Sequence, residues 1–447
     1  MLGKKIQAIL NCAILASGLV LLILKYPSNY PLASTLLSAD ALYLPALLDD
    51  LFKQGGKLAD WYLTPAPYLF PDLLMYSIAW IFFKSPADQI IAHAVLQVVG
   101  TAFFIYLIAS KCTSKNAGAA AVLAAILFTL LGLDFGNVET LAKTGNAYAL
   151  IFTSAFHYGA FLLQLIVLSI VFLYADQRRN EKSLWLAALC VIAFVSALSD
   201  SIFLVQFSLP FAGALLVLRL QFRNSRLYSF PLLAAPLFFS LLGMKSYDFV
   251  ISNRTKYPIE IEISKLGQQF DFLRNFFFDM FLQQPLIAVF LIAFYGVAFA
   301  SIFYWPKSKH DDEKSTRLRF LLIFSLVSAL TTIVATSVVT NLSSGPRYLI
   351  PFFYWPPIIT IIVIATVLRS NKLHFISLAM LLTLAFHAPE NNEDDSNPAV
   401  AQVKDIRCIV EEIKASGLHK GIATYWDAKP IQVFTGGMLK LLNTRAN

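Results

Sequence analysis

Acidic, imidazole and guanidinium side chains stand beside the ends of several long apolar runs of this sequence. Asp40 follows the first run, His157 and Asp200 lie near the ends of two others, and Arg347 opens a fourth. An arginine fork binds phosphate bidentately and keeps its charge. A nearby carboxylate can accept the proton of a hydroxyl, and cationic donors stabilise charge on a departing phosphate. These residue types favour transfer of a group from a lipid phosphate to an alcohol, if the fold brings them to one membrane face.

The composition indicates which elements must position these side chains. Of the 447 residues, 57% are hydrophobic and 14% are charged, whereas a soluble domain has roughly 45–50% and about 25%. These values exclude a disordered chain, a fibrous repeat and an ordinary soluble enzyme, and they predict an all-α polytopic membrane protein. The net charge of +8 is typical of basic cytoplasmic loops, so we expect no nucleic-acid partner.

Eleven apolar runs are long enough to predict membrane-spanning helices, which need about 20 residues each. A further run, Tyr68–Phe83, contains Pro71 and Asp72, and the clean stretch after them is short, so we predict an interfacial helix there. The eleven predicted spans cover approximately residues 6–24, 88–110, 117–134, 147–174, 184–199, 202–218, 228–244, 285–304, 320–340, 348–368 and 373–388.

The distribution of charge orients these spans. We place the N-terminus in the cytoplasm and do not count Tyr68–Phe83 as a span. The cytoplasmic segments then hold 17 of the 35 basic residues but only five of the 27 acidic ones. Making Tyr68–Phe83 a span would invert everything after it and spoil this bias. We therefore predict a cytoplasmic N-terminus, an extracytoplasmic C-terminus and a bacterial inner-membrane location.

Two domains are expected. Residues 1–388 form the transmembrane domain, whose first outer loop, 25–87, is long. Residues 389–447 form a small extracytoplasmic α/β tail, which opens with a polar linker. Within the tail, the pattern predicts a helix over 400–415 and a strand over 421–426.

This layout resembles the GT-C superfamily, which comprises integral-membrane glycosyltransferases that use polyprenyl-phosphate-linked sugars. The likeness lies in a long outer loop with an acid, Asp40, near its start, and in two segments that match the juxtamembrane helices of the family, Asp40–Gln54 and Tyr68–Phe83. Arg347-Tyr348-Leu349-Ile350-Pro351 is similar to the Arg-Tyr-x-x-Pro element of many bacterial members, and Gly421–Ala428 resembles a tail element of others.

The resemblance implies an inverting hexosyltransferase that moves one sugar from a polyprenyl phosphate donor to an outward-facing acceptor. The acceptor would be the O-antigen of lipopolysaccharide or another cell-envelope glycan. By the same resemblance Asp40 is the general base and Arg347 binds the lipid phosphate. Many members place two acids side by side at the loop start, whereas alanines flank Asp40, so Asp49 and Asp50 stay open as bases. This departure gives no case for a bound metal, although a need for a divalent cation stays open.

Further site candidates are His157, Asp200 and Tyr348, with Tyr425, Trp426 and Asp427 in the tail. Tyr425 and Trp426 either hold a sugar or pack the core of the tail.

Two other functions are compatible with the sequence. His93, Gln97 and Gln164 lie at span depth, as polar residues do in a transporter or a lipid-linked-saccharide flippase. A water-filled midplane cavity would favour that function. The tail could instead dock partners in a non-catalytic envelope assembly protein, and deletion of residues 390–447 would then abolish only partner binding.

Overall fold

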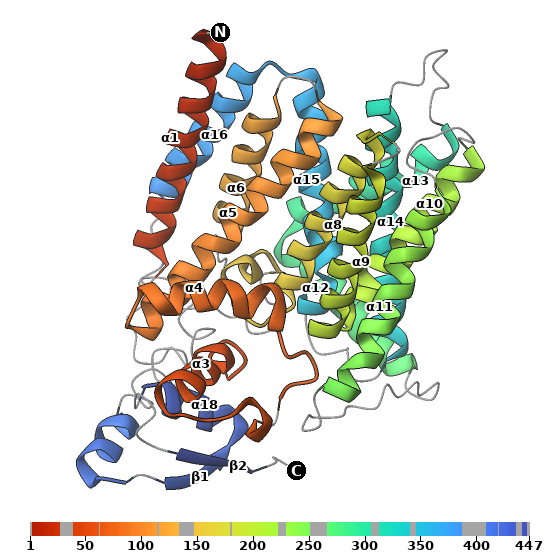
Figure 1. The fold of residues 1–447 in the computed structure, drawn as a ribbon. Coiled ribbons are helices and arrows are strands. Elements are labelled where there is room, and N and C mark those ends of the chain that lie inside the picture. Colours follow the sequence, from red (N-terminus) through yellow and green to blue (C-terminus); the bar gives the residue numbers. More distant parts are fainter. Residues whose placement is uncertain are drawn as a thin grey trace.

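A computed structural model gives the fold of the chain as a bundle of long helices with a small appendage at one end (Figure 1). All structural statements below concern the residues that this structure describes. These are residues 2–26, 39–61, 63–113, 116–133, 147–178, 181–221, 229–250, 266–304, 313–339, 346–386, 408–418, 420–434 and 440–444.

Eight of the described helices are long and apolar enough to cross a membrane. Each coincides with one of the predicted spans, so the all-helical, multi-pass membrane class is confirmed. The eight are α1 (Leu2–Lys25), α5 (Pro86–Cys112), α8 (Tyr158–Asp176), α9 (Lys182–Ser199), α11 (Phe230–Val250), α13 (Pro285–Tyr304), α14 (Glu313–Val338) and α15 (Ile350–Val367).

Three further predicted spans lie on shorter apolar helices. They are α6 (Ala117–Leu133), α16 (Ser370–Phe386) and α10 (Leu209–Gln221), which continues from the π-helical turn η4 (Leu204–Ser208). A helix of 17 residues, such as α6, rises about 25 Å at roughly 1.5 Å per residue, somewhat less than the ~30 Å hydrocarbon core. The amphipathic helix α12 (Leu266–Gln283) precedes α13 and packs against α13 and α14.

The predicted span 147–174 is wrong in its start, because the chain breaks before α8. A 3₁₀ turn, η3 (Ala147–Phe152), is followed by five non-helical residues, and α8 begins only at Tyr158. Ala155 and His157 have φ angles of 59° and 68°. These left-handed values cannot continue a right-handed helix, so the apolar pattern alone placed the helix start too early.

The first outer loop contains two helices at the positions that the sequence predicts. α3 (Tyr43–Lys53) follows Asp40, and α4 (Leu74–Phe82) continues from the π-helical turn η2 (Leu69–Leu73). A 3₁₀ turn, η1 (Leu58–Asp60), lies between them. In Figure 1, α4 runs across the ends of the bundle helices rather than along them. The loop therefore forms a shelf beneath one end of the bundle.

The tail lies beside this shelf, at the end of the molecule opposite the N-terminus (Figure 1). Strands β1 (Lys420–Thr424) and β2 (Lys440–Thr444) pair in parallel, and α18 (Tyr425–Phe434) connects them in sequence and packs against α3. Residues 408–416 are helical, as predicted, whereas 400–407 lie outside the described residues. The strand expected over 421–426 is wrong at its end, since the chain turns into α18 at Tyr425.

Candidate functional site

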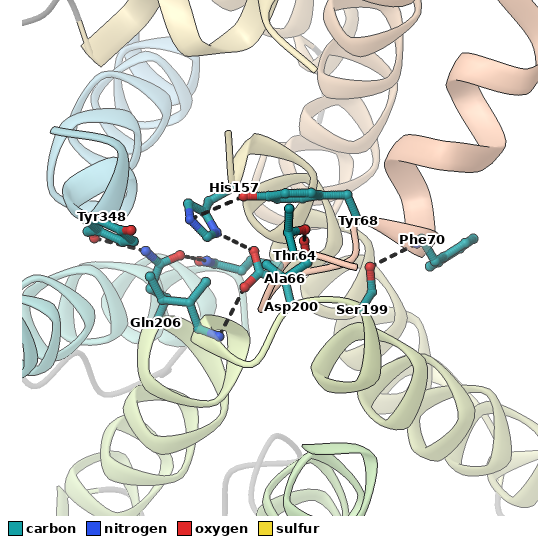
Figure 2. A network of polar contacts seen from close by, with 11 residues as sticks. Thr64, Ala66, Tyr68, Phe70, His157, Ser199, Asp200, Gln206 and Tyr348 are labelled. Atoms are coloured by element: carbon teal, nitrogen blue, oxygen red, sulfur yellow. Dashed lines mark hydrogen bonds and ion pairs between the residues drawn. The ribbon is translucent and has the colours of Figure 1, made fainter. Parts of the chain in front are cut away.

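A polar network joins the bundle to the first outer loop at the shelf end of the molecule (Figure 2). Its members come from five segments that are far apart in the sequence. They are Asp40 before α3, Tyr68 before η2, His157 at the start of α8, Asp200 at the end of α9, and Arg347 with Tyr348 in the turn η7 (Pro346–Leu349). The structure thus brings together Asp40, His157, Asp200, Arg347 and Tyr348, all of which the sequence singles out.

Arg347 and Asp40 form an ion pair. The Nη1 atom of Arg347 donates to Oδ2 of Asp40 at 2.9 Å, and the two side chains are 26% and 17% exposed. The guanidinium carbon lies 5.1 Å from the ring centre of Tyr348 and 6.0 Å from that of Phe156. The Nε atom of Arg347 is buried and has no hydrogen-bond partner. The guanidinium therefore sits between aromatic walls with a carboxylate on one of its terminal nitrogens.

His157 and Asp200 form a second, more deeply buried pair. Nδ1 of His157 lies 2.6 Å from Oδ2 of Asp200. The backbone N–H of Ile202 donates to the other carboxylate oxygen at 3.2 Å, which fixes the orientation of the carboxylate. The His157 ring lies between two tyrosine rings, with ring centres 5.5 Å from Tyr68 and 5.1 Å from Tyr348. Tyr348 therefore links the histidine pair to Arg347.

Left-handed backbone conformations form the turns that present these side chains. Tyr68, Ala155 and His157 have φ angles between 52° and 68°, which non-glycine residues rarely adopt and which cost on the order of 1–3 kcal/mol each. The Tyr68 turn is held by α9, because Tyr68 N–H donates to Ser199 O at 3.3 Å and Phe70 N–H donates to Ser199 Oγ at 2.9 Å. Such strain persists only where surrounding contacts fix it.

Asp72 is a site residue that sequence reasoning missed. In the sequence Asp72 only interrupts an apolar run, although an acid within such a run can itself indicate a functional residue. Its side chain is 2% exposed, and its Oδ1 atom has no hydrogen-bond partner. A Cβ atom on Gly159, in the first turn of α8, would lie 1.8 Å from Oδ2 of Asp72. Burial, followed by the charge of Asp200, raises the pKa of Asp72 to about 7, against the lowering effect of backbone N–H groups.

The other two candidate bases, Asp49 and Asp50, have partners within the shelf. Asp49 accepts from the indole N–H of Trp80 at 2.7 Å and pairs with Lys53 at 2.7 Å. Asp50 accepts from the indole N–H of Trp61 at 2.6 Å. These contacts tie α3 to α4 and to the segment after η1. Within the described residues, the hydrogen bonds and ion pairs of Asp49 and Asp50 do not reach Arg347 or His157, so Asp40 is the acid of the three that meets the phosphate-binding candidate.

The tail meets the shelf through a buried lysine. The ammonium of Lys429, on α18, lies 4.0 Å from the ring centre of Trp61, a cation–π contact. Burial lowers the pKa of Lys429 to about 8, and Asp50 acts in the opposite direction. Tyr425, Trp426 and Asp427 open α18, but the placement of their side chains lies outside the described part of the chain.

Polar side chains at span depth form hydrogen bonds with one another within and between helices. Gln97 donates to the His93 ring at 3.1 Å and to Thr153 O at 3.2 Å. Gln164 accepts from Trp355 at 3.3 Å and donates to Gln206 at 3.4 Å. A bundle satisfies buried polar groups in this way.

Comparisons with known proteins add no relative. No protein-family model matches this chain, and no curated protein matches it. Within the described ranges, no three His, Cys, Asp or Glu side chains gather in a group that could hold a metal ion.

Proposed function

We propose that this protein is a GT-C-like glycosyltransferase of a bacterial inner membrane. It moves one hexose from a polyprenyl phosphate donor to an extracytoplasmic glycan acceptor, such as the O-antigen or another envelope glycan. The observation that carries the proposal is the contact between Asp40 and Arg347, which are 307 positions apart and meet at the shelf end of the bundle. A base candidate and a phosphate-binding candidate thus lie at one membrane depth.

The reaction is a direct displacement. Arg347 binds the phosphate of the donor, and Asp40 takes the proton of the attacking acceptor hydroxyl. The bond from the acceptor oxygen to the anomeric carbon forms as the bond from that carbon to the phosphate oxygen breaks. The polyprenyl phosphate leaves with the electron pair, and its new charge is stabilised by Arg347. Because attack and departure take place on opposite faces of the carbon, the anomeric centre is inverted.

The layout of the chain supports the same proposal. We infer eleven spans, from the eight long helices together with α6, α10 and α16, with the N-terminus cytoplasmic. An odd number of spans puts the chain ends on opposite faces, and in Figure 1 the N-terminus and the tail lie at opposite ends of the bundle. The network and the tail then lie on the extracytoplasmic face, where a lipid-linked sugar and an envelope glycan meet.

The deciding experiment compares envelope glycans by mass spectrometry in strains that lack the gene or carry one version of it. We expect one hexose-sized increment to disappear on deletion and to return with the wild type. The matched control is Asp271→Asn, which removes one acidic charge from an exposed pair with Arg274 on α12, and it should also restore the increment. Asp40→Asn and Arg347→Ala, made at normal levels, should not. Glycans that are identical in all of these strains would exclude the proposal.

A further inference from the structure

Asp40 occupies one of the two terminal nitrogens of Arg347. A guanidinium offers a terminal edge, made by its two Nη atoms, and a side edge that includes Nε. The Nε atom of Arg347 is buried, so a bulky lipid phosphate cannot approach along the side edge. The terminal edge remains, and Asp40 accepts the hydrogen bond from its Nη1 atom at 2.9 Å.

The surroundings make a second anion on this guanidinium costly. Two carboxyl groups, Asp40 and Asp200, act on the phenol of Tyr68. Burial raises the pKa of the Tyr68 phenol, and Asp200 and Asp40 raise it further against the opposing effect of Arg347. The acids therefore outweigh the guanidinium at that position. A phosphate that arrived while Asp40 stayed in place would share one half-buried cation with a second anion a few ångströms away.

We propose that the donor phosphate and the Asp40 carboxylate compete for Arg347, so that donor binding displaces Asp40 and releases it to act as the base. This inference rests on the proposed function and adds an order of events to it. Before the donor arrives, Oδ2 of the carboxylate accepts a hydrogen bond from the guanidinium, so this oxygen is not available to an acceptor hydroxyl. After the exchange, the phosphate holds the guanidinium and the carboxylate is free to meet the acceptor hydroxyl. No proton moves and no covalent bond changes in the exchange itself.

The exchange makes an unusual prediction about binding. Removing the charge of the base should strengthen the binding of phosphate, although it abolishes transfer. The probe is farnesyl phosphate, titrated by calorimetry into the purified full-length protein in detergent. We expect Asp40→Asn to bind it roughly tenfold more tightly than the wild type, Arg347→Ala to lose most of the binding, and the surface control Asp271→Asn to bind it as the wild type does.

A double variant separates competition for Arg347 from general repulsion by Asp40. If Asp40 acts by occupying the guanidinium, Asp40→Asn has no effect on binding in the Arg347→Ala background. Equal tightening in both backgrounds would overturn the exchange, and so would equal or weaker binding by Asp40→Asn and by a second variant, Asp40→Ala. Binding that Arg347→Ala leaves unchanged would instead remove the phosphate clamp and, with it, the proposed function.

Discussion

The Nδ1 atom of His157 lies 2.6 Å from the Oδ2 atom of Asp200, and this contact joins the residue before α8 to the residue after α9. The two residues are 43 positions apart, and both side chains are buried. The pair holds the imidazole against the ring of Tyr348, whose neighbour in sequence is Arg347. We therefore infer that His157 and Asp200 are positioning residues, which support the proposed phosphate-binding Arg347 through Tyr348.

Breaking this pair should slow transfer without removing the site. Asp200→Asn keeps the shape of the side chain and loses its charge, and His157→Phe keeps the ring between the two tyrosines and loses the hydrogen bond to Asp200. Since a displacement of about 1 Å at a reacting centre can cost on the order of 100-fold in rate, we expect each variant to lower the transfer rate by one to two orders of magnitude. Initial rates with a lipid-linked donor measure this.

The double variant tests whether the two residues act as a unit. If they do, His157→Phe combined with Asp200→Asn is no slower than the worse single variant. Losses that multiply would show that the two side chains act independently. The melting temperature of each variant, compared with the wild type, separates slowed transfer from lost folding.

Asp72 should make the stability of the protein depend on pH. Its pKa is raised from 3.8 to about 7 in the fold, so between these values the folded protein holds a proton that the unfolded chain has released. Stability therefore falls as the pH rises through this window. At about 1.4 kcal/mol per pKa unit, the effect is at most about 4 kcal/mol. We expect the apparent melting temperature in detergent to fall between about pH 5 and pH 7.

The variant that isolates this effect is Asp72→Asn, which cannot titrate and should flatten the curve. Asp88→Asn is the control, because Asp88 is exposed at the start of α5 and its removal should leave the slope as in the wild type. A slope that persists in Asp72→Asn would assign the pH dependence to another group.

Gly159 should tolerate no side chain while Asp72 is present. A methyl group there would meet Oδ2 of Asp72 at 1.8 Å, and overpacking of this kind typically costs roughly 1–3 kcal/mol. We expect Gly159→Ala to lower the melting temperature, and we expect Asp72→Ala in that background to regain part of the loss by removing the clash. Gly296→Ala is the control, since nothing lies within 4 Å of its Cβ position. Equal effects of the two alanines would refute the contact.

An ion-pair cluster at the other end of the bundle should matter for stability alone. Arg317, on α14, is buried and pairs with Asp176 on α8 and with Glu313 at 3.0 Å, while Lys111 on α5 holds Asp176 at 2.8 Å. Because removing one partner strands a partly buried carboxylate, we expect Arg317→Met to cost roughly 3 kcal/mol of unfolding free energy. The exposed pair of Arg274 gives the control, and Arg274→Met should cost under about 1 kcal/mol.

A measurement of transfer activity distinguishes the Arg317 cluster from the polar network at the shelf end. Transfer by Arg317→Met, measured well below its melting temperature, should match that of the wild type, because α8 carries the cluster at its last turn and His157 before its first. A large loss of rate in folded protein would contradict a purely structural role for Arg317.

Membrane depth explains why part of the site can be predicted from the sequence. Asp40, Asp200 and Arg347 lie beside the ends of apolar runs that the charge distribution predicts to be outer, and His157 lies within three turns of such an end. A bilayer forces such ends to one level. Depth does not specify contacts, however. Asp49 and Asp50 have the same chemistry as Asp40, and only the fold directs them to the indoles of Trp80 and Trp61.

Backbone conformation explains why the rest was missed. The apolar pattern places the start of the α8 helix too early, because apolar character carries no information about the left-handed turn at Ala155 and His157. The burial of Asp72 could not be predicted, because it depends on the turn that places Gly159 against this carboxyl group. Similarly, nothing in the sequence pairs Lys429 with Trp61, because a cation–π contact between distant segments leaves no periodic pattern.

The cation–π contact between Lys429 and Trp61 has a mechanical consequence for Asp40, the proposed base. The indole of Trp61 is bound to Asp50, near the end of α3, and α3 begins three residues after Asp40. A continuous series of contacts thus runs from the tail through the indole and α3 to the carboxylate that meets Arg347. A displacement of α18 by a bound glycan chain or a partner protein would therefore be transmitted through α3 to Asp40. Asp40 lies some 390 positions away along the chain but only one short helix away in space.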